Sequence, residues 1–230
     1  MTVKRDYGSF SKAATQRLAP RIADLGYRKI KGGIFGRDKL GWVEGFFLQQ
    51  SQWGSGKFRV SIGIHLPKLY DFYRTPMKER HFGLSVHRVV TAEGADHGDK
   101  WFPADDSTQL DASLEQVVTG LRNAERWFAT FRSLSDVVDA FRAQNGGGGG
   151  SYGCLLIQLG RRDEAVRCLE ETERHMTTPR WVDRKGTQVD PSTPGAVFIP
   201  PSEADRRHLA AVQDALRDLR ASGPDGAAIS

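Results

Sequence analysis

Two histidines and a group of polar side chains are the residues of this sequence whose types could do chemistry. Histidine titrates near neutral pH, so His65 and His87, on neighbouring predicted strands, could act as acid and base. Further polar residues are predicted around the same sheet face: Arg37, Gln49, Ser51, Arg59 and Ser61. Such an array can bind a ligand, a peptide or a nucleic-acid backbone, and an ordinary solvent-facing sheet surface is the alternative.

Neither a nucleophile nor a set of metal ligands accompanies these side chains in the sequence. The six histidines lack the His-x-x-x-His spacing of a metal site. The only two cysteines, Cys154 and Cys168, lie on predicted helices and are typical of reduced, buried thiols. We therefore assign no catalytic residue and expect no metal and no cofactor.

The elements that must position the polar residues are two strands, predicted at 42–52 and 57–66. In the second strand, apolar residues alternate with polar or small ones, as expected for a sheet with one buried face. A three-residue loop at 54–56 would set the following pairs opposite each other: Leu48 and Ile62, Phe46 and Ile64, Gln49 and Ser61, Ser51 and Arg59.

Aromatic residues near this strand pair raise the question of a partner contact. Core packing is the expected role of Trp42 and Trp101. Trp53 differs, because it lies at the predicted hairpin tip beside Gly54. Exposed aromatic side chains anchor protein partners, so we predict that Trp53 contacts a partner.

The rest of the chain predicts an α+β fold. A helix interrupted at Pro20 and ended by Gly26 precedes a strand at 34–38, and a fourth strand is predicted at 82–90. A short edge strand is expected at Trp101. Helical periodicity begins near Asp106. The prediction is an antiparallel meander sheet of four to five strands covered by helices, with a C-terminal helical hairpin and a final helix.

Five consecutive glycines, Gly146–Gly150, mark the predicted domain boundary. A phosphate-binding loop would need a strand before it and a Lys with Ser or Thr after it, so a flexible connector is the interpretation. Residues 1–145 then form the sheet domain, 146–150 a linker, 151–222 a helical annex with an irregular Pro-rich segment, and 223–230 a disordered tail. Within the annex, Leu156 to Ala165 resembles half of a tetratricopeptide unit, and one copy cannot form a solenoid.

Charge and hydropathy limit the class of protein. Residues 1–104 carry 18 Lys and Arg against 9 Asp and Glu, a net charge of +9, whereas the whole chain carries +5. This asymmetry permits attraction to nucleic acid without demanding it. No apolar run approaches the ~18 residues of a membrane span, and no secretory signal is recognised, so we expect a cytoplasmic protein without membrane contact.

Four short segments resemble an uncharacterised bacterial family, domain of unknown function 4304. They are Leu25-Gly26-Tyr27-Arg28-Lys29, Gly33-Ile34-Phe35-Gly36-Arg37, Gln49-Gln50-Ser51 and Phe58-Arg59-Val60-Ser61-Ile62-Gly63-Ile64. Tyr27 stands where that family usually has Phe. The resemblance spans roughly residues 12–145 and implies an α+β fold, with no activity, cofactor or catalytic residue to transfer.

The leading hypothesis is a non-catalytic protein that binds another protein through the polar sheet face and the hairpin at Trp53. An immunity or antitoxin role would be one instance of such binding. Nucleic-acid binding by the basic first half is the alternative, against which no helix-turn-helix or RNA-recognition signature is present. An enzyme with a histidine-containing pocket on the sheet face is the second alternative.

Overall fold

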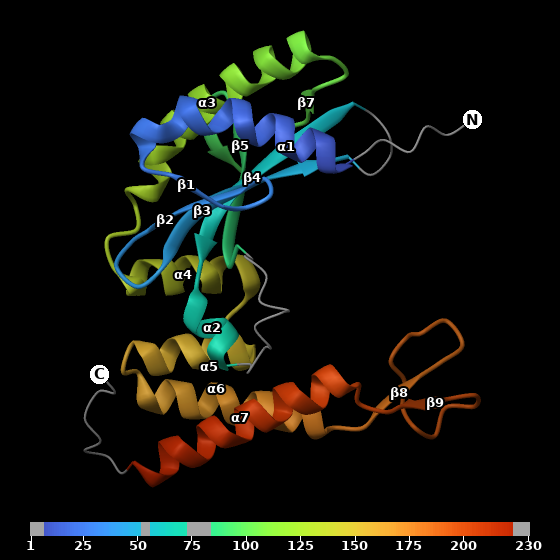
Figure 1. The fold of residues 1–230 in the computed structure, drawn as a ribbon. Coiled ribbons are helices and arrows are strands. Elements are labelled where there is room, and N and C mark those ends of the chain that lie inside the picture. The colour runs from blue at the N-terminus through green and yellow to red at the C-terminus, as the bar shows by residue number, and fades with distance from the viewer. Residues whose placement is uncertain (1–6, 52–55, 73–83, 223–230) are drawn as a thin grey trace. The chain divides into compact units, whose positions relative to one another are not determined.

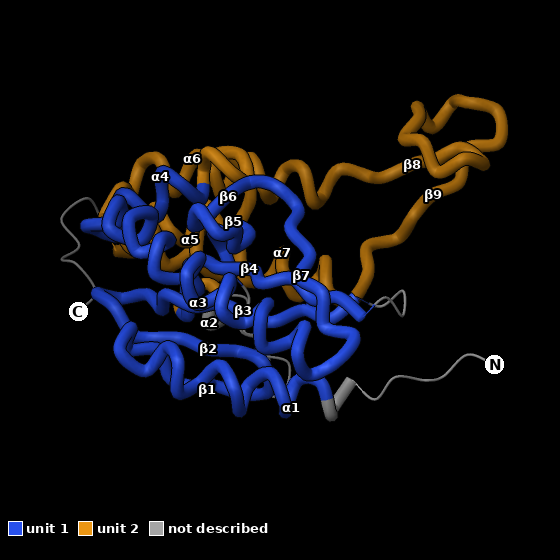
Figure 2. Tube along the Cα trace, turned by 90° about the horizontal axis from the view of Figure 1, so that it is seen from above, with its two compact units in different colours: residues 1–67, 81–141 blue, residues 68–80, 142–230 orange. Residues whose placement is uncertain are grey.

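The structure is a computed structural model that describes residues 7–51, 56–72 and 84–222 (Figure 1). The chain divides into two compact units, residues 1–67 with 81–141 and residues 68–80 with 142–230 (Figure 2). The predictions for Trp53, for most of the 54–56 turn and for the tail at 223–230 fall outside the described residues.

The first unit is built on an antiparallel sheet, which confirms the predicted α+β class. Its strand order is β1-β2-β3-β4-β5-β6, and β7 also pairs with β4. The strands are β1 (Arg28–Lys31), β2 (Ile34–Asp38), β3 (Val43–Gln50), β4 (Lys57–His65), β5 (Val86–Thr91), β6 (Gly94–Asp96) and β7 (Phe102–Pro103). Within the described residues the sheet therefore has seven strands, and β1 and β6 are the ones that the sequence did not predict.

The predicted register of β3 and β4 is wrong by two residues. Phe46 lies opposite Ile62, not Ile64, and Gln49 lies opposite Arg59, not Ser61. The pairing closes at Ser51, whose N–H donates to the carbonyl of Lys57 at 2.9 Å, so the connection is longer than a three-residue loop. Because side chains alternate with a period of two, this shift leaves the β3 and β4 side chains on their predicted faces.

Helices cover one face of the sheet, which we call the core face. The segment α1 (Tyr7–Leu18) continues as the 3-10 helix η1 (Ala19–Leu25), and both lie on the same side of the sheet as α3 (Ser107–Phe128) (Figure 1). The change of helix type occurs at Pro20, as predicted, and Gly26 ends η1 with a φ of 75°. An ion pair of 2.9 Å between Arg17 and Asp111 links α1 to α3.

The core of the first unit lies between these helices and the core face. Phe35 and Phe46 stack with ring centroids 4.9 Å apart, and Phe10 contacts Phe58 at 5.4 Å. Core-face side chains that are fully buried include Phe46, Phe58, Val60, Ile62 and Ile64. Their burial fixes which face of each strand points to the helices, and thus which residues the other face presents.

The second unit is a small helical assembly with a two-stranded ribbon. Its elements are α5 (Gly149–Gln158), α6 (Arg162–Thr177), β8 (Arg180–Val182), β9 (Val197–Ile199) and α7 (Glu203–Ala221). Two further helices, α2 (Pro67–Phe72) and α4 (Leu134–Asn145), lead the chain into it from the first unit. The predicted helical hairpin and final helix are present. The ribbon was not predicted, although residues 196–199 stand out as an apolar run.

The glycine run differs from the predicted linker at its end. Gly148 is the N-cap of α5, and Gly149 and Gly150 form its first turn. A Cβ atom at Gly150 would lie 2.5 Å from Nε2 of His208 on α7, and one at Gly153 would lie 2.5 Å from Cδ2 of Leu169 on α6. These glycines therefore allow α5 to approach its neighbours closely, a role that sequence composition alone did not indicate.

Candidate functional site

Arg59 is the centre of the polar cluster on the second sheet face, the face opposite the core face. Its Nε donates to Oε1 of Gln49 at 2.7 Å, and its Nη1 lies 3.7 Å from Oδ1 of Asp99. The guanidinium lies 5.6 Å from the ring centroid of Trp101, whose Nε1 donates to Asp99 at 2.9 Å. The structure thus brings together Gln49 and Arg59, as predicted, and adds an acidic and an aromatic partner.

Two of the predicted polar residues are not presented for binding. Ser51 is 5% exposed and Ser61 is 6% exposed. A ligand on the second sheet face could therefore reach Arg59 and Gln49 but not these hydroxyl groups. This part of the face is also not the plain solvent-facing surface that was the alternative interpretation.

The two histidines lie near each other on adjacent strands of the second sheet face. His87 lies opposite Gly63, two residues before His65 on β4. Partial burial is the main cause that lowers the pKa of His87, and the positive charges of Arg88 and Arg59 lower it further. Loss of the proton therefore occurs more easily than for a free histidine.

Arg37 does not join this cluster, because it lies on the core face. It pairs with Glu44 in the register of β2 and β3, and it shares its face with Phe35, two residues earlier. The period of two along β2 was therefore the sequence signal that places Arg37 on the core face. The prediction of Arg37 on the polar sheet face is wrong for this reason.

The Arg37 side chain instead joins four elements of the first unit. Its Nη2 lies 2.7 Å from Glu44 on β3 and 2.7 Å from Glu125 on α3. Its Nη1 donates to the carbonyl of Leu25, the last residue of η1, at 2.8 Å. The guanidinium also lies 4.7 Å from the ring centroid of Tyr27. Its donors are thus committed to the protein itself.

Burial and charge have opposite effects on the ionisation of this group. Burial disfavours the charged form of Arg37, but hydrogen bonds to Glu125 and Glu44 overcome it and leave the pKa raised. Burial also raises the pKa of Tyr27, only partly offset by Arg37. Because Glu44 is fully buried, this charged group stabilises the fold only while all its members are present.

These residues fall inside the region that matches a known family. Residues 18–130 match the family described as domain of unknown function (DUF4304). This match covers just under half of the chain, so these residues are similar to DUF4304 domains. This confirms the resemblance found in the sequence. Comparison with curated proteins and with solved structures gave no match.

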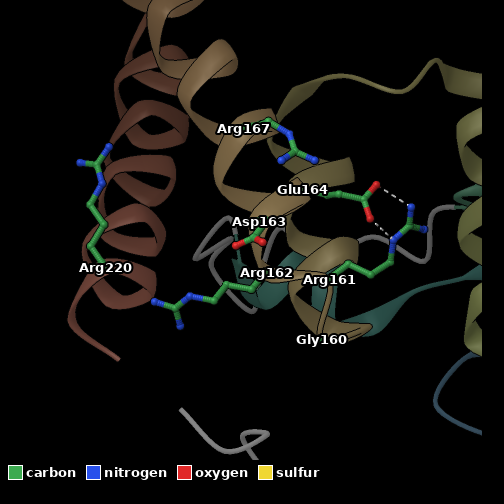
Figure 3. Close-up of a pocket in the computed structure, with 7 residues that line it drawn as sticks. All are labelled: Gly160, Arg161, Arg162, Asp163, Glu164, Arg167 and Arg220. Atoms are coloured by element: carbon green, nitrogen blue, oxygen red, sulfur yellow. Dashed lines mark hydrogen bonds and ion pairs between the residues drawn. The ribbon is translucent and has the colours of Figure 1, made fainter. Parts of the chain in front are cut away.

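Outside the matched residues, the second unit contains a hollow of about 790 Å³ between the start of α6 and the end of α7 (Figure 3). Its lining residues are mostly charged: Gly160, Arg161, Arg162, Asp163, Glu164, Arg167 and Arg220. The sequence did not indicate this hollow. Gly160 and Glu164 were noted only within the tetratricopeptide-like pattern, and Arg220 comes from a helix more than fifty residues away.

A second, more apolar recess of about 380 Å³ lies beside the β8–β9 ribbon. Its apolar lining includes Met176, Pro179, Phe198, Ile199, Pro200 and Pro201. Polar groups at its edge come from Arg180, His175 and His208. Neither this recess nor the arginine-lined hollow is lined by His65 or His87, so the predicted histidine pair does not coincide with either cavity.

Within the part of the chain that the structure describes, no group of three or more His, Cys, Asp or Glu side chains could hold a metal ion. Over the same residues, every helix is too short or too polar to cross a bilayer. Trp53 lies outside the described residues, so its predicted contact stays a prediction.

Proposed function

We propose that the chain binds another protein without catalysing a reaction, and that the β8–β9 ribbon (residues 180–199) provides the contact. The observation that supports this proposal is the exposure of all three β9 side chains. Val197 is 56%, Phe198 44% and Ile199 40% exposed. Contiguous exposed apolar side chains are characteristic of interaction surfaces.

The recess beside the ribbon suits the anchor residue of a partner. Protein interfaces depend on a few large side chains that fill well-packed apolar cavities. The volume of about 380 Å³ and the proline-rich, apolar lining fit one such side chain. Figure 1 shows β8 and β9 standing clear of α6 and α7, the helices that the ribbon connects, so a partner has access to both strands.

The charges of the ribbon define the chemistry of the partner. Arg180, Arg184 and Lys185 form no ion pair with another described residue. The carboxylates of Asp183 and Asp190 instead accept hydrogen bonds from backbone N–H groups of the ribbon turns, at 2.8 to 2.9 Å. Residues 180–199 thus carry three positive and two negative side chains, so the ribbon presents apolar side chains with a net charge of +1. Charge complementarity calls for an apolar patch bordered by Asp or Glu.

A purification from the cells that naturally produce the protein, followed by binding measurements with the recovered partner, tests this proposal. We expect a stoichiometric partner that binds the purified full chain directly and is lost with Phe198→Asp. Leu40→Asp is the matched control, because Leu40 is an exposed apolar residue of the first unit, 76% accessible. A partner lost equally with both variants, or unaffected by Phe198→Asp, would contradict the proposal. Circular dichroism checks that both variants fold.

Nucleic-acid binding is a second candidate, favoured by the Arg59 cluster. Arginine stacked on an indole is a feature of surfaces that bind unpaired bases, and Arg59 lies over Trp101 with Lys57 and Lys100 near in sequence. Asp99 opposes this function, because its carboxylate neutralises part of the charge. Fluorescence anisotropy with single- and double-stranded oligonucleotides at low salt decides it. Binding that weakens steeply with salt and with Arg59→Gln would support this candidate, and no binding at low salt removes it.

A further inference from the structure

The geometry of the hollow between α6 and α7 points to a binding site for a small molecule that carries a phosphate group. Four arginines and two acidic residues line it, and Glu170 outside the lining pairs with Arg220, which leaves an excess of one positive charge that favours an anion. Arginine suits phosphate because its planar fork donates two parallel hydrogen bonds. The volume of about 790 Å³ leaves room for more than the phosphate itself.

The interactions within the hollow show which arginines are available. Arg161 is committed to Glu164 through two hydrogen bonds of 2.7 and 2.6 Å, drawn in Figure 3. That pairing is the main reason why the pKa of Glu164 is lowered, so both groups stay charged. Arg167 is exposed and makes no hydrogen bond or ion pair with another described residue. Its guanidinium is therefore free to bind a ligand.

Arg162 and Arg220 hold the two walls together. Arg162 donates to the carbonyl of Leu219 in the last turn of α7, and because that acceptor is neutral the charge of Arg162 is not cancelled. Arg220 pairs with Glu170 of α6 at 2.8 Å. These contacts fix the start of α6 against the end of α7. In Figure 3 the Arg162 side chain extends from α6 toward the end of α7, whereas Arg161 and Arg167 extend to the opposite side of α6.

Asp163 is the group that opposes an anion in this site. It lines the hollow, is exposed, and makes no ion pair with another described residue. A phosphate dianion in the hollow would be repelled by its carboxylate. The two unpaired side chains of opposite charge, Arg167 and Asp163, therefore give the site a test in which two substitutions act in opposite directions.

The test is an NMR titration of the full-length chain with inorganic phosphate, with AMP and with adenosine, at low and constant ionic strength. We expect phosphate and AMP to shift the amide resonances of residues 160–167 with a saturating curve, whereas adenosine does not. Binding of AMP alone would show that the group attached to the phosphate contributes to affinity. Binding of phosphate alone would show that the attached group prevents binding, which would contradict a site for a larger molecule. If neither phosphate nor AMP gave saturable shifts, the proposed site would be wrong.

Variants locate the effect. Arg167→Gln should weaken binding about tenfold, since it removes a charge-assisted hydrogen bond, and Arg167→Lys should restore part of the affinity. Asp163→Asn should strengthen binding. The matched control is Arg174→Gln, which removes an exposed arginine near the other end of α6 and should leave the dissociation constant unchanged. An equal loss with Arg174→Gln would mean general attraction of anions to a basic surface. Because these residues are remote from β9 in the sequence, failure here leaves the proposed protein contact untouched.

Discussion

At the scale of single residues, the arginine that looked like a binding residue is a structural one. Arg37 is 19% exposed and Glu44 is fully buried. Removing the arginine leaves a buried carboxylate without its partner, which typically costs about 3–5 kcal/mol. We predict that Arg37→Met lowers the free energy of unfolding by about that amount in a urea titration, and that adding Glu44→Leu recovers much of it.

The control for that prediction is Arg28→Met. Arg28 forms an ion pair with Asp38 in which both side chains are well exposed, 72% and 65%. Exposed pairs contribute about 0–1 kcal/mol, so this variant should unfold almost as the original protein does. If Arg37→Met were no more harmful than Arg28→Met, the account of a buried charged group would be wrong.

His208 predicts a dependence of stability on pH. Its partial burial lowers its pKa below the ordinary 6.5, although the nearby Asp205 raises it in part. Above pH 6.5 the residue is neutral in both the folded and the unfolded chain. As the pH falls below 6.5, the unfolded chain binds a proton that the folded chain resists, so stability is lost until the pH has fallen through the lowered pKa of the folded chain. The melting temperature should fall less steeply between about pH 7 and 5 in His208→Asn than in the original protein; identical slopes would exclude this role.

At the scale of elements, the glycines of α5 set how closely the helices of the second unit pack. A Cβ atom at Gly153 would lie 2.5 Å from Leu169, which is fully buried and has no room to move. Gly153→Ala should therefore destabilise the chain by about 1–3 kcal/mol, even though alanine favours helices. Gly148→Ala is the control, because a Cβ there meets no atom within 4 Å. Thermal unfolding of both variants checks this, and equal melting temperatures would contradict it.

The sequence predicted those elements whose own residues carry a periodic signal. The strand β4 was placed within one residue, because its apolar residues alternate with polar or small ones over its length. In contrast β1 was missed, because all four of its side chains are exposed and show no alternation. Strands of three residues such as β9 carry too few positions for a period, and β9 pairs with residues 180–182, which lie well before it in the chain.

At the scale of the whole molecule, the candidate surfaces depend on residues brought together from distant parts of the chain. No sequence pattern indicated that Arg220 and Arg167 line one hollow or that Asp99 lies beside Arg59, since turns and helix packing decide these neighbours. The match to DUF4304 covers residues 18–130, whereas both the ribbon and the arginine-lined hollow lie beyond it. The family match therefore covers strands β1 to β7 together with η1 and α3, and the proposed contacts belong to the second unit.

Photo-crosslinking at Phe198 is the most direct test of the proposal that the β8–β9 ribbon binds a partner protein. A photoreactive phenylalanine analogue is placed at position 198 in the full chain and, as a control, at Leu40, an apolar position of the first unit that is even more exposed, 76% against 44%. If the ribbon is the contact, we expect one adduct of discrete mass from position 198. It should be joined to a protein segment in which apolar residues are bordered by Asp or Glu. Adducts from both positions alike, or none from position 198 in the cells that naturally produce the protein, would contradict the assignment of the β8–β9 ribbon as the binding surface.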